Sequence, residues 1–349
     1  LGHAGVEIVL LTADRKAGKH VGEIFPHLAG QGLPFLIALD EVEWSGLDLD
    51  IVFCALPHGT TQEIVAGLLH ATGHGLVDEL VVEERGDLIA ALKSDVRVFD
   101  LSADFRLDDV ATYAEWYGHA HLAPDLQTEA TYGLSEFARD RIRASRLISC
   151  PGCFPTAALL PLLPLVEAGQ VDASDIVIDS KSGVTGAGRA AKEEMLFGEV
   201  AEGIHVYGIA RHRHAPEIEQ ELTRAAGHAV TVSFTPHLMP MNRGILSTVY
   251  VRLVNGATAG DLRATLLSRY ADEPFVAVVP EGLAPSTRHV RGSNHCLIGV
   301  FEDRVAGRAI LVSVLDNLIK GAAGQAVQNM NIACGLPETQ GLGQLPLFP

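Results

Sequence analysis

The sequence predicts an α/β protein in which a parallel-sheet domain is joined to an α+β domain. Short apolar runs, each followed by a loop and a helical stretch, occupy the first part of the chain and are typical of parallel strands buried on both faces. Later runs alternate apolar and polar residues beside single helices, which favours an α+β arrangement. With 349 residues, the chain also exceeds the usual size of one domain.

Composition narrows the class of protein. Hydrophobic residues make up 48% and charged residues 20%, as in globular enzymes, and no apolar run is long enough to span a bilayer. The net charge of -17 disfavours nucleic acid and anionic membranes as partners. Five scattered cysteines indicate a reducing, cytoplasmic compartment. Several cations beside glycine-rich and histidine-rich stretches suit a small anionic substrate: Arg106, Lys181, Arg189, Arg211, Arg213, Arg288 and Arg291.

The apolar run 6–11 is the first strand expected in this chain, and we interpret it as the second strand of a dinucleotide-binding fold. A loop follows it at 12–18. In dinucleotide-binding folds, the loop after the second strand carries an acidic residue for the ribose hydroxyls or an Arg for a 2′-phosphate. Thr12 and Arg15 therefore favour NADP, although Asp14 points the other way. A solvated surface loop explains this stretch equally well.

Two further strands are expected at 50–56 and 96–101, with a helix at 62–69 between them. Ligands bind at the carboxyl ends of parallel strands, so Pro57, His58 and Gly59 are candidates for a cofactor loop. Arg106 follows the later strand closely and is placed to bind an anion. We expect a polar loop and an exposed helical segment at about 70–93, with no assigned chemistry.

Cys153 lies on a tight turn directly before a long apolar stretch. Pro151 and Gly152 make the bend and Pro155 suits the start of a helix, so the thiol should stand at a helix N-terminus, where thiolate is favoured. The alternative is a small buried hydrophobe. Cys150 and Cys153 also form a C-x-x-C pair, which leaves a redox role open, whereas a zinc ribbon would need a second pair.

The chain after Cys153 changes character. A strand at 175–180 enters a glycine-rich loop at 181–189 and a helix at 190–199, and backbone donors at such a helix start can hold phosphate. His212 and His214 would lie on one side of an extended backbone, and general acid/base use is favoured over a metal site because no fourth ligand is evident. The remaining elements are half-buried antiparallel strands at 230–235 and 244–253, a helix at 259–270, strands at 296–301 and 309–315, and a closing helix from 316 that returns to the first domain.

Five motifs together carry a resemblance to a known family. They occur at 151–156, 181–189, 212–218, 234–238 and 316–326, and in this order they resemble N-acetyl-γ-glutamyl-phosphate reductase of arginine biosynthesis. The resemblance implies a semialdehyde dehydrogenase-like fold, with an NADP-binding Rossmann domain at 1–152 and 316–349. An α+β catalytic and oligomerisation domain would occupy 153–315, in a homodimer or homotetramer.

The resemblance also implies a reaction, the reduction of N-acetylglutamyl 5-phosphate by NADPH through a thioester. Cys153 corresponds to the nucleophile, and His214 is preferred to His212 as acid/base. The residues expected to bind NADP are Thr12, Arg15, Pro57, His58, Gly59, Ser182, Gly183 and Asn317. Those expected to bind the acyl phosphate are Arg106, Lys181 and Arg189, and no metal is expected. The chain departs from the family at Cys150 and in a longer stretch around 70–93.

Other functions remain compatible with the same residues. Aspartate-semialdehyde dehydrogenase and an aminoadipyl-phosphate reductase share the mechanism, and the sequence does not determine the length of the acyl phosphate. A Cys-His hydrolase would use Cys153 and His214 without a nucleotide. An NADP-sensing protein would keep the cofactor loops and tolerate loss of Cys153.

The start of the chain lacks one expected feature. A Rossmann domain begins with a strand and a glycine-rich turn that binds the pyrophosphate, whereas residues 1–5 directly precede what we interpret as the second strand. We therefore expect the natural protein to carry a further strand, turn and helix before Leu1.

Overall fold

The computed structural model describes residues 1–43, 47–70, 96–188 and 192–348. They form two compact units, 1–52 with 63–97 and 53–62 with 98–349, which are described separately. The predicted boundaries at 152/153 and 315/316 stay a prediction. Most of the predicted polar stretch at 70–93 lies outside the described residues.

Up to residue 52, the described part of the first unit contains only short elements. Strand β1 (Leu11–Thr12) pairs in parallel with β2 (Leu36–Ile37), beside α1 (Val21–Ile24), η1 (Pro26–Leu28) and η2 (Leu39–Glu41). The predicted strand at 6–11 is wrong except at its last residue, because 6–10 have no regular structure and their apolar side chains are largely exposed. Within the described residues β1 finds a partner only in β2, and a strand without ladder bonds does not form.

A four-stranded sheet has the order β3-β4-β6-β5. It contains β3 (Ile51–Cys54), β4 (Arg97–Asp100), β5 (Thr131–Tyr132) and β6 (Leu147–Ser149), and β6 runs parallel to both β4 and β5. The strands predicted at 50–56 and 96–101 are confirmed in shorter form, as is the helix after the first, α2 (Thr61–His70). Helices α5 (Val110–Tyr117), α6 (Pro124–Gln127) and α7 (Ser135–Ala144) complete this region, for which the sequence offered no assignment.

The second sheet has seven strands in the order β11-β12-β13-β10-β7-β9-β8. They are β7 (Val171–Gly183), β8 (His205–Val206), β9 (Ser233–Met239), β10 (Ile245–Leu253), β11 (Val276–Val278), β12 (Cys296–Glu302) and β13 (Arg308–Leu315). The mixed α+β character is confirmed; β9 runs parallel to β7 on one side and antiparallel to the short β8 on the other. The helix predicted at 190–199 is wrong: η4 (Glu193–Met195) and α9 (Phe197–Val200) are separated by the extended backbone of Leu196.

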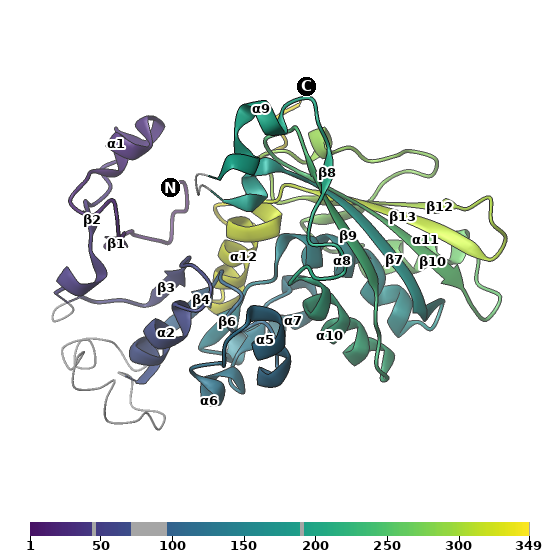
Figure 1. The fold of residues 1–349 in the computed structure, drawn as a ribbon, viewed down its shortest axis with the longest axis horizontal. Coiled ribbons are helices and arrows are strands. Elements are labelled where there is room, and N and C mark those ends of the chain that lie inside the picture. The colour runs from purple at the N-terminus through teal and green to yellow at the C-terminus, as the bar shows by residue number, and fades with distance from the viewer. Residues whose placement is uncertain (44–46, 71–95, 189–191, 349) are drawn as a thin grey trace. The chain divides into compact units, whose positions relative to one another are not determined.

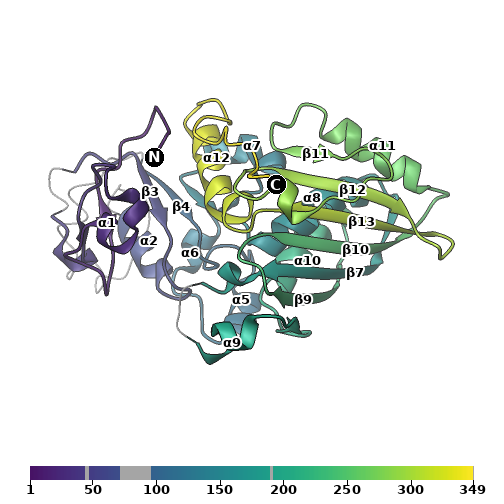
Figure 2. The same ribbon diagram turned by 90° about the horizontal axis from the view of Figure 1, so that it is seen from above.

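Helices cover one face of this sheet. Helix α8 (Cys153–Glu167) packs against β7, β10 and β13, while α10 (Ala215–Ala226) and α11 (Ala259–Arg269) pack on α8 (Figures 1 and 2). Ser180, Ser247 and Ser313 point to this covered face in register. Alternate side chains point to the opposite face and are partly exposed, among them Val177, Leu246, Tyr250, Leu297, Ile310 and Val312.

Helix α8 has two prolines in its interior, and the structure compensates for each. A proline lacks an N–H, so Pro161 and Pro164 cannot bond the carbonyls of Ala157 and Leu160. The Ser313 hydroxyl donates to the first carbonyl at 2.5 Å, and the Tyr270 hydroxyl donates to the second. Hydroxyls from β13 and the end of α11 thus satisfy the buried carbonyls of the helix that begins at Cys153.

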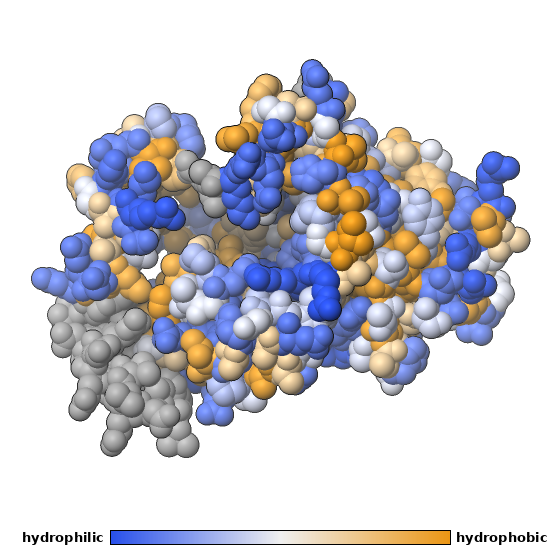
Figure 3. Space-filling model, in the orientation of Figure 1, coloured by the Kyte–Doolittle hydropathy of each residue, from blue (hydrophilic) through white to orange (hydrophobic). Residues whose placement is uncertain are grey.

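The chain closes with η6 (Ile319–Ala323), a π-helical turn, and α12 (Gly324–Ala333), which packs on α7. Among the helices of the described part of the chain, none combines the length and apolar character needed to cross a membrane. Figure 3 shows hydrophobic residues in small groups among hydrophilic ones on the face that it displays.

Candidate functional site

The candidate site is built around Cys153, the first residue of α8. Gly152 is the N-cap with an extended backbone (φ -66°, ψ 158°), so the predicted position of the thiol at a helix N-terminus is confirmed. Cys153 is partly exposed. Its Cβ lies against Gly321 of the π-helical turn, where an added Cβ would come within 2.7 Å of it. The side chain is therefore held between the helix start and the C-terminal segment.

Glu217, in the first turn of α10, supports the turn before Cys153. Its buried carboxylate accepts hydrogen bonds from the backbone N–H of Gly152 at 2.7 Å and from the hydroxyl of Tyr132 at 2.9 Å. The other oxygen lies 3.4 Å from Nη1 of Arg106. The carboxylate thus ties α10 to the turn that carries the thiol.

Arg106 is buried and directs most of its donors into the protein. Nε donates to the carbonyl of Cys150 at 2.9 Å and Nη2 to that of Leu101 at 3.1 Å. Nη1 has only two long contacts, with Glu217 at 3.4 Å and with His214 Nε2 at 3.5 Å. The guanidinium therefore orders the nucleophile turn, and Nη1 is the group least committed to the protein.

His214 is the N-cap residue of α10, and its ring lies directly over Gly152. A Cβ on that glycine would come within 2.5 Å of His214 Nε2, so only glycine permits this approach. Burial, together with the nearby His212 and Arg106, lowers the pKa of His214 well below its usual range. The imidazole is therefore neutral near pH 7 and can accept a proton. Its Nδ1 is buried without a hydrogen-bond partner among the described residues.

His212 supports His214. Its Nδ1 accepts a hydrogen bond from the backbone N–H of His214 at 3.2 Å, and the two ring centroids are 4.8 Å apart. The ring packs edge-on against Phe154 and Phe234. Burial lowers the pKa of His212 to about 4, with a further contribution from Arg213. The two rings meet through a turn, since His214 has helical dihedrals, and not through the extended backbone that we expected.

The expectation of a resting thiolate is wrong for this structure. Burial raises the pKa of Cys153 to about 11, although the charge of Arg106 and the N–H groups of the helix start oppose this. Loss of water around the sulfur outweighs the helix N-terminus, since burial penalises the charged form. The site at rest therefore pairs a thiol with a neutral imidazole, a combination that can generate a thiolate when the proton moves to the ring.

The predicted cofactor loop at Pro57, His58 and Gly59 is already bonded within the protein. Asp104 accepts hydrogen bonds from the N–H of Gly59 at 2.9 and 3.0 Å and from that of Thr61 at 3.1 Å. His58 Nδ1 accepts one from the N–H of Ala103 at 3.1 Å. A carboxylate thus binds the backbone donors of this candidate cofactor loop, while Pro57 shapes the turn through its carbonyl.

Ser182, Gly183 and Asn317 come together at the end of β7. The Asn317 side chain accepts from the N–H of Gly244 at 2.7 Å and donates to Thr185 Oγ1 at 3.0 Å. A Cβ on Gly186 would lie 3.0 Å from Ser182 Oγ and 3.7 Å from Asn317 Nδ2. Residue 186 thus approaches these two side chains closely, which glycine permits. Asn317 is four residues before Gly321, which contacts Cys153.

The structure does not bring the remaining predicted residues to Cys153. Lys181 points to the sheet face opposite α8, because side chains alternate along a strand, and pairs with Asp179 at 2.7 Å; its contact with substrate stays a prediction. Arg189 lies outside the described residues. Thr12 and Arg15 belong to the first unit, whose placement relative to Cys153 is not determined.

Glu217 and Asp104 had no assigned role in the sequence, and Arg213 had one only as a cation suited to an anionic substrate. Glu217 lies inside the motif at 212–218, and its place three residues after His214 puts both at one helix start. Asp104 follows a strand end, a common position for functional side chains. Arg213 is exposed, lies 4.9 Å from the ring centroid of Tyr117, and has no carboxylate within ion-pair distance among the described residues.

Comparison with known proteins gives consistent relatives. The family model described as "Semialdehyde dehydrogenase, dimerisation domain" matches residues 153–317. N-acetyl-gamma-glutamyl-phosphate reductase of Afipia carboxidovorans is 55% identical over 99% of this chain and 92% of its own length. The protein of the same name from Rhodospirillum rubrum is 55% identical over 99% of this chain and 93% of its own length.

Solved structures share the fold at much lower identity. Aspartate semialdehyde dehydrogenase II of Vibrio cholerae is 18% identical, with a TM-score of 0.62 over 93% of this chain and 90% of that one. Aspartate semialdehyde dehydrogenase with NADP from Candida albicans is 16% identical, with a TM-score of 0.60 over 95% of this chain and 91% of that one. The fold is therefore that of a semialdehyde dehydrogenase. Given the identity to the bacterial relatives over nearly its whole length, the chain belongs to the N-acetyl-γ-glutamyl-phosphate reductase family.

Proposed function

We propose that the protein reduces N-acetylglutamyl 5-phosphate to N-acetylglutamate 5-semialdehyde and phosphate, using NADPH, in arginine biosynthesis. The observation that carries the proposal is the junction of Cys153 and His214 at two facing helix starts. The thiol begins α8, and His214 Nε2 lies over Gly152, one residue before the sulfur-bearing residue. The choice of substrate rests on family membership, and the reaction type rests on this arrangement of thiol and imidazole.

The chemistry follows from the protonation states. Neutral His214 accepts the thiol proton of Cys153, and the sulfur attacks the acyl carbon as phosphate leaves, which forms a thioester. Bound NADPH supplies the hydride that reduces the thioester carbon. The carbon–sulfur bond then breaks, the aldehyde departs, and His214 returns its proton to the sulfur. The low pKa of His214 suits the second transfer, because the ring releases its proton readily, whereas the first transfer runs against the high pKa of the thiol.

We assign the nicotinamide end of NADP to the space beside Ser182, Gly183 and Asn317. The proposal is supported by the close approach of Gly186 to Ser182 and Asn317 and by the chain connection from Asn317 to the turn that contacts Cys153. Pro57, His58, Gly59, Thr12 and Arg15 remain proposed contacts for the rest of the cofactor. Because the N–H of Gly59 already donates to Asp104, this loop would contact the cofactor through side chains or backbone carbonyls.

We propose that two cations receive the anionic groups of the substrate. Arg106 Nη1 lies 3.5 Å from His214 Nε2, and its long contacts can be replaced by a phosphate oxygen. Arg213 lies between the two histidines in the sequence and is exposed over Tyr117. Its free guanidinium suits a carboxylate, which it can bind with two parallel hydrogen bonds.

We also propose that the protein is a homo-oligomer that pairs through the sheet face opposite α8. Partly exposed apolar side chains line that face, from Val177 on β7 to Val312 on β13. The description of the matching family model as a dimerisation domain supports this choice.

The reverse reaction tests the activity directly. Reduction of NADP by N-acetylglutamate 5-semialdehyde should require inorganic phosphate or arsenate and should be followed by absorbance at 340 nm, with aspartate semialdehyde run beside it. Turnover with the N-acetylated substrate alone supports the proposal. Faster reduction of NADP with aspartate semialdehyde would reassign the substrate. Absence of any aldehyde-dependent reduction of NADP would reject dehydrogenase chemistry.

A further inference from the structure

A fully buried ion pair lies behind the nucleophile. The Nζ of Lys320 donates to Glu136 Oε1 at 2.6 Å, and neither side chain is exposed to solvent. Nζ also donates to Gln328 Oε1 at 2.9 Å, and Asn294 donates to that same oxygen at 3.1 Å. The proposed reaction uses none of these groups. A buried ion pair rarely stabilises a fold more than apolar residues of similar size would. Stability alone therefore does not explain why Lys320 and Glu136 occupy this position.

Lys320 belongs to the π-helical turn that touches Cys153. In this turn the N–H of Gly321 donates to the carbonyl of Asp316, and that of Ala323 donates to Leu318, both at 3.0 Å and both five residues back. Such turns are rare and occur mostly at functional sites. The wide turn brings the Cα of Gly321 so close to Cys153 that an added Cβ would lie 2.7 Å from the Cys153 Cβ.

The neighbours Lys320 and Gly321 contact opposite partners. Successive residues of a helix point about 100° apart, so fixing one side chain fixes the rotation of the next residue. Lys320 reaches Glu136 on α7 and Gln328 on α12, while Gly321 faces the nucleophile. Asp316 holds the start of the turn, because its carboxylate accepts from the N–H of Leu318 at 2.9 Å.

The geometry points to Lys320 and Glu136 as positioning residues: their buried ion pair locks the rotation of the π-helical turn, and the turn holds Cys153 in its reactive position through Gly321. The inference deepens the proposed function, since it concerns the same thiol. Neither side chain touches the substrate in this scheme.

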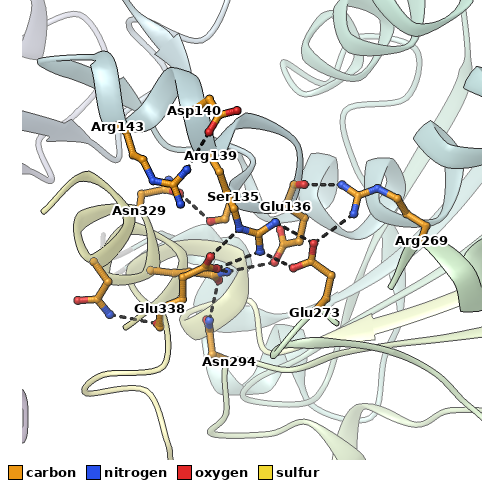
Figure 4. A network of polar contacts seen from close by, with 12 residues as sticks. Ser135, Glu136, Arg139, Asp140, Arg143, Arg269, Glu273, Asn294, Asn329 and Glu338 are labelled. Atoms are coloured by element: carbon orange, nitrogen blue, oxygen red, sulfur yellow. Dashed lines mark hydrogen bonds and ion pairs between the residues drawn. The ribbon is translucent and has the colours of Figure 1, made fainter. Parts of the chain in front are cut away.

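The surrounding network provides a matched control. Arg139 on α7 pairs with Glu273 at 2.5 Å and with Glu338 at 2.5 Å, and Glu338 also accepts from Gln328 at 3.1 Å. Figure 4 shows Glu136 and Arg139 in one connected set with Glu273 and Glu338. Within the part of the chain that the structure describes, Arg139 bonds Glu273 and Glu338 and makes no hydrogen bond or ion pair with the π-helical turn, so its loss should weaken the network and spare Cys153.

The experiment uses three variants of the full chain. They are the single variant Lys320→Met, the double variant that combines Glu136→Gln with Lys320→Met, and the control Arg139→Met. The double variant removes the unpaired buried carboxylate that the single variant leaves, so it should fold. Two quantities are measured: the rate of Cys153 alkylation by iodoacetamide, which needs no substrate, and kcat with KM. We expect the double variant to change the alkylation rate at least fivefold and to lower kcat about 100-fold with KM little changed, since a displacement of 1 Å can cost that much. Arg139→Met should lower the melting temperature only.

A folded double variant with wild-type alkylation and kcat would overturn the inference, as would equal losses in Arg139→Met. Gly321→Ala provides a second route, because its added Cβ collides with Cys153 while Lys320 stays in place. It should alter alkylation in the same way, whereas Gly198→Ala, where nothing lies within 4 Å of the added Cβ, should not. If Gly321→Ala alkylates like the wild type, the contact does not position the thiol. Failure of the proposed function would instead appear as absent turnover with the alkylation pattern intact.

Discussion

Cys153 and His214 depend on each other because the thiol needs a base to become a thiolate and the neutral ring is the base proposed here. Burial raises the pKa of the thiol to about 11 and lowers that of His214. Both groups are therefore uncharged at rest, and Cys153 becomes a thiolate only when its proton moves to the ring during the reaction. The glycines at 152 and 321 permit this close packing, since a Cβ at either position would collide with a site residue.

We expect His214→Asn to lower kcat by about two to four orders of magnitude, the usual effect of losing a general acid/base. His212→Asn should cost far less, because His212 contacts the backbone N–H of His214 rather than the thiol. Steady-state kinetics with both variants decide between them. A larger loss in His212→Asn would reverse the two assignments.

His212 should also make stability depend on pH. Its pKa is about 4 in the folded protein and about 6.5 when unfolded, so between these values the unfolded chain binds a proton that the folded one excludes. The stability contributed by the neutral ring is complete above pH 6.5 and is lost as the pH falls. The free energy of unfolding should thus fall more steeply for wild type than for His212→Gln between pH 7 and 4.5, by up to about 1.4 kcal/mol per pH unit. Parallel urea-denaturation curves for both proteins would contradict this.

Arg213→Met should raise KM for the acyl phosphate about 10-fold and leave kcat within a few-fold, since a charged hydrogen bond contributes roughly 1.5–3 kcal/mol. The matched control is Arg211→Met, which removes a neighbouring exposed cation without the contact to Tyr117. An unchanged KM in Arg213→Met, or equal effects in both variants, would remove Arg213 from the proposed substrate site.

At the scale of elements, α8 and β13 form one supporting unit. The two prolines would ordinarily break a helix interior, and the apolar character of α8 does not repair the missing N–H donors. Ser313 and Tyr270 do so from outside the helix. The helix that presents Cys153 therefore depends on hydroxyls that lie more than a hundred residues away in the sequence.

Removing either hydroxyl should leave a buried carbonyl without a donor. We expect Ser313→Ala and Tyr270→Phe each to lower the free energy of unfolding by about 1–3 kcal/mol. Ser268→Ala, an exposed position on α11, should change it by less than about 0.5 kcal/mol. Chemical denaturation measures all three, and near-neutral effects at Ser313 and Tyr270 would show that the carbonyls need no donor.

At the scale of the whole molecule, charge and surface have separate roles. The net charge of -17 opposes anions at long range, so the proposed substrate depends on local cations such as Arg106. The uncovered face of the seven-stranded sheet carries apolar side chains on adjacent strands, an arrangement that marks interaction surfaces when contiguous.

We expect Val312→Arg to disrupt assembly, because Val312 lies on that face in a central strand and a buried unpaired charge is costly. Val305→Arg places the same charge at an exposed position between β12 and β13 and should leave assembly intact. Sedimentation velocity measures the outcome. A monomeric wild type, or a Val312→Arg protein that sediments like the wild type, would reject this interface.

The sequence by itself determined the local features of this protein. The strands at 50–56 and 96–101, the helix start at Cys153 and the mixed second domain all follow from periodicity and turn chemistry, which act over a few residues, although the first of these strands is not buried as expected, since Phe53 is exposed. The family motifs identified the family for the same reason, since they are short and occur in order. The failed strand at 6–10 and the broken helix at 190–199 lie where short-range patterns had no tertiary partner to stabilise them.

Only the tertiary structure decided how the site works. That Arg106 bonds the carbonyl of Cys150, that Glu217 holds Gly152 and that Lys181 points away from Cys153 each depends on which distant segments pack together. The protonation state of Cys153 has the same origin: the helix start is encoded locally, but burial comes from residues far along the chain, and the loss of water outweighs the helix field.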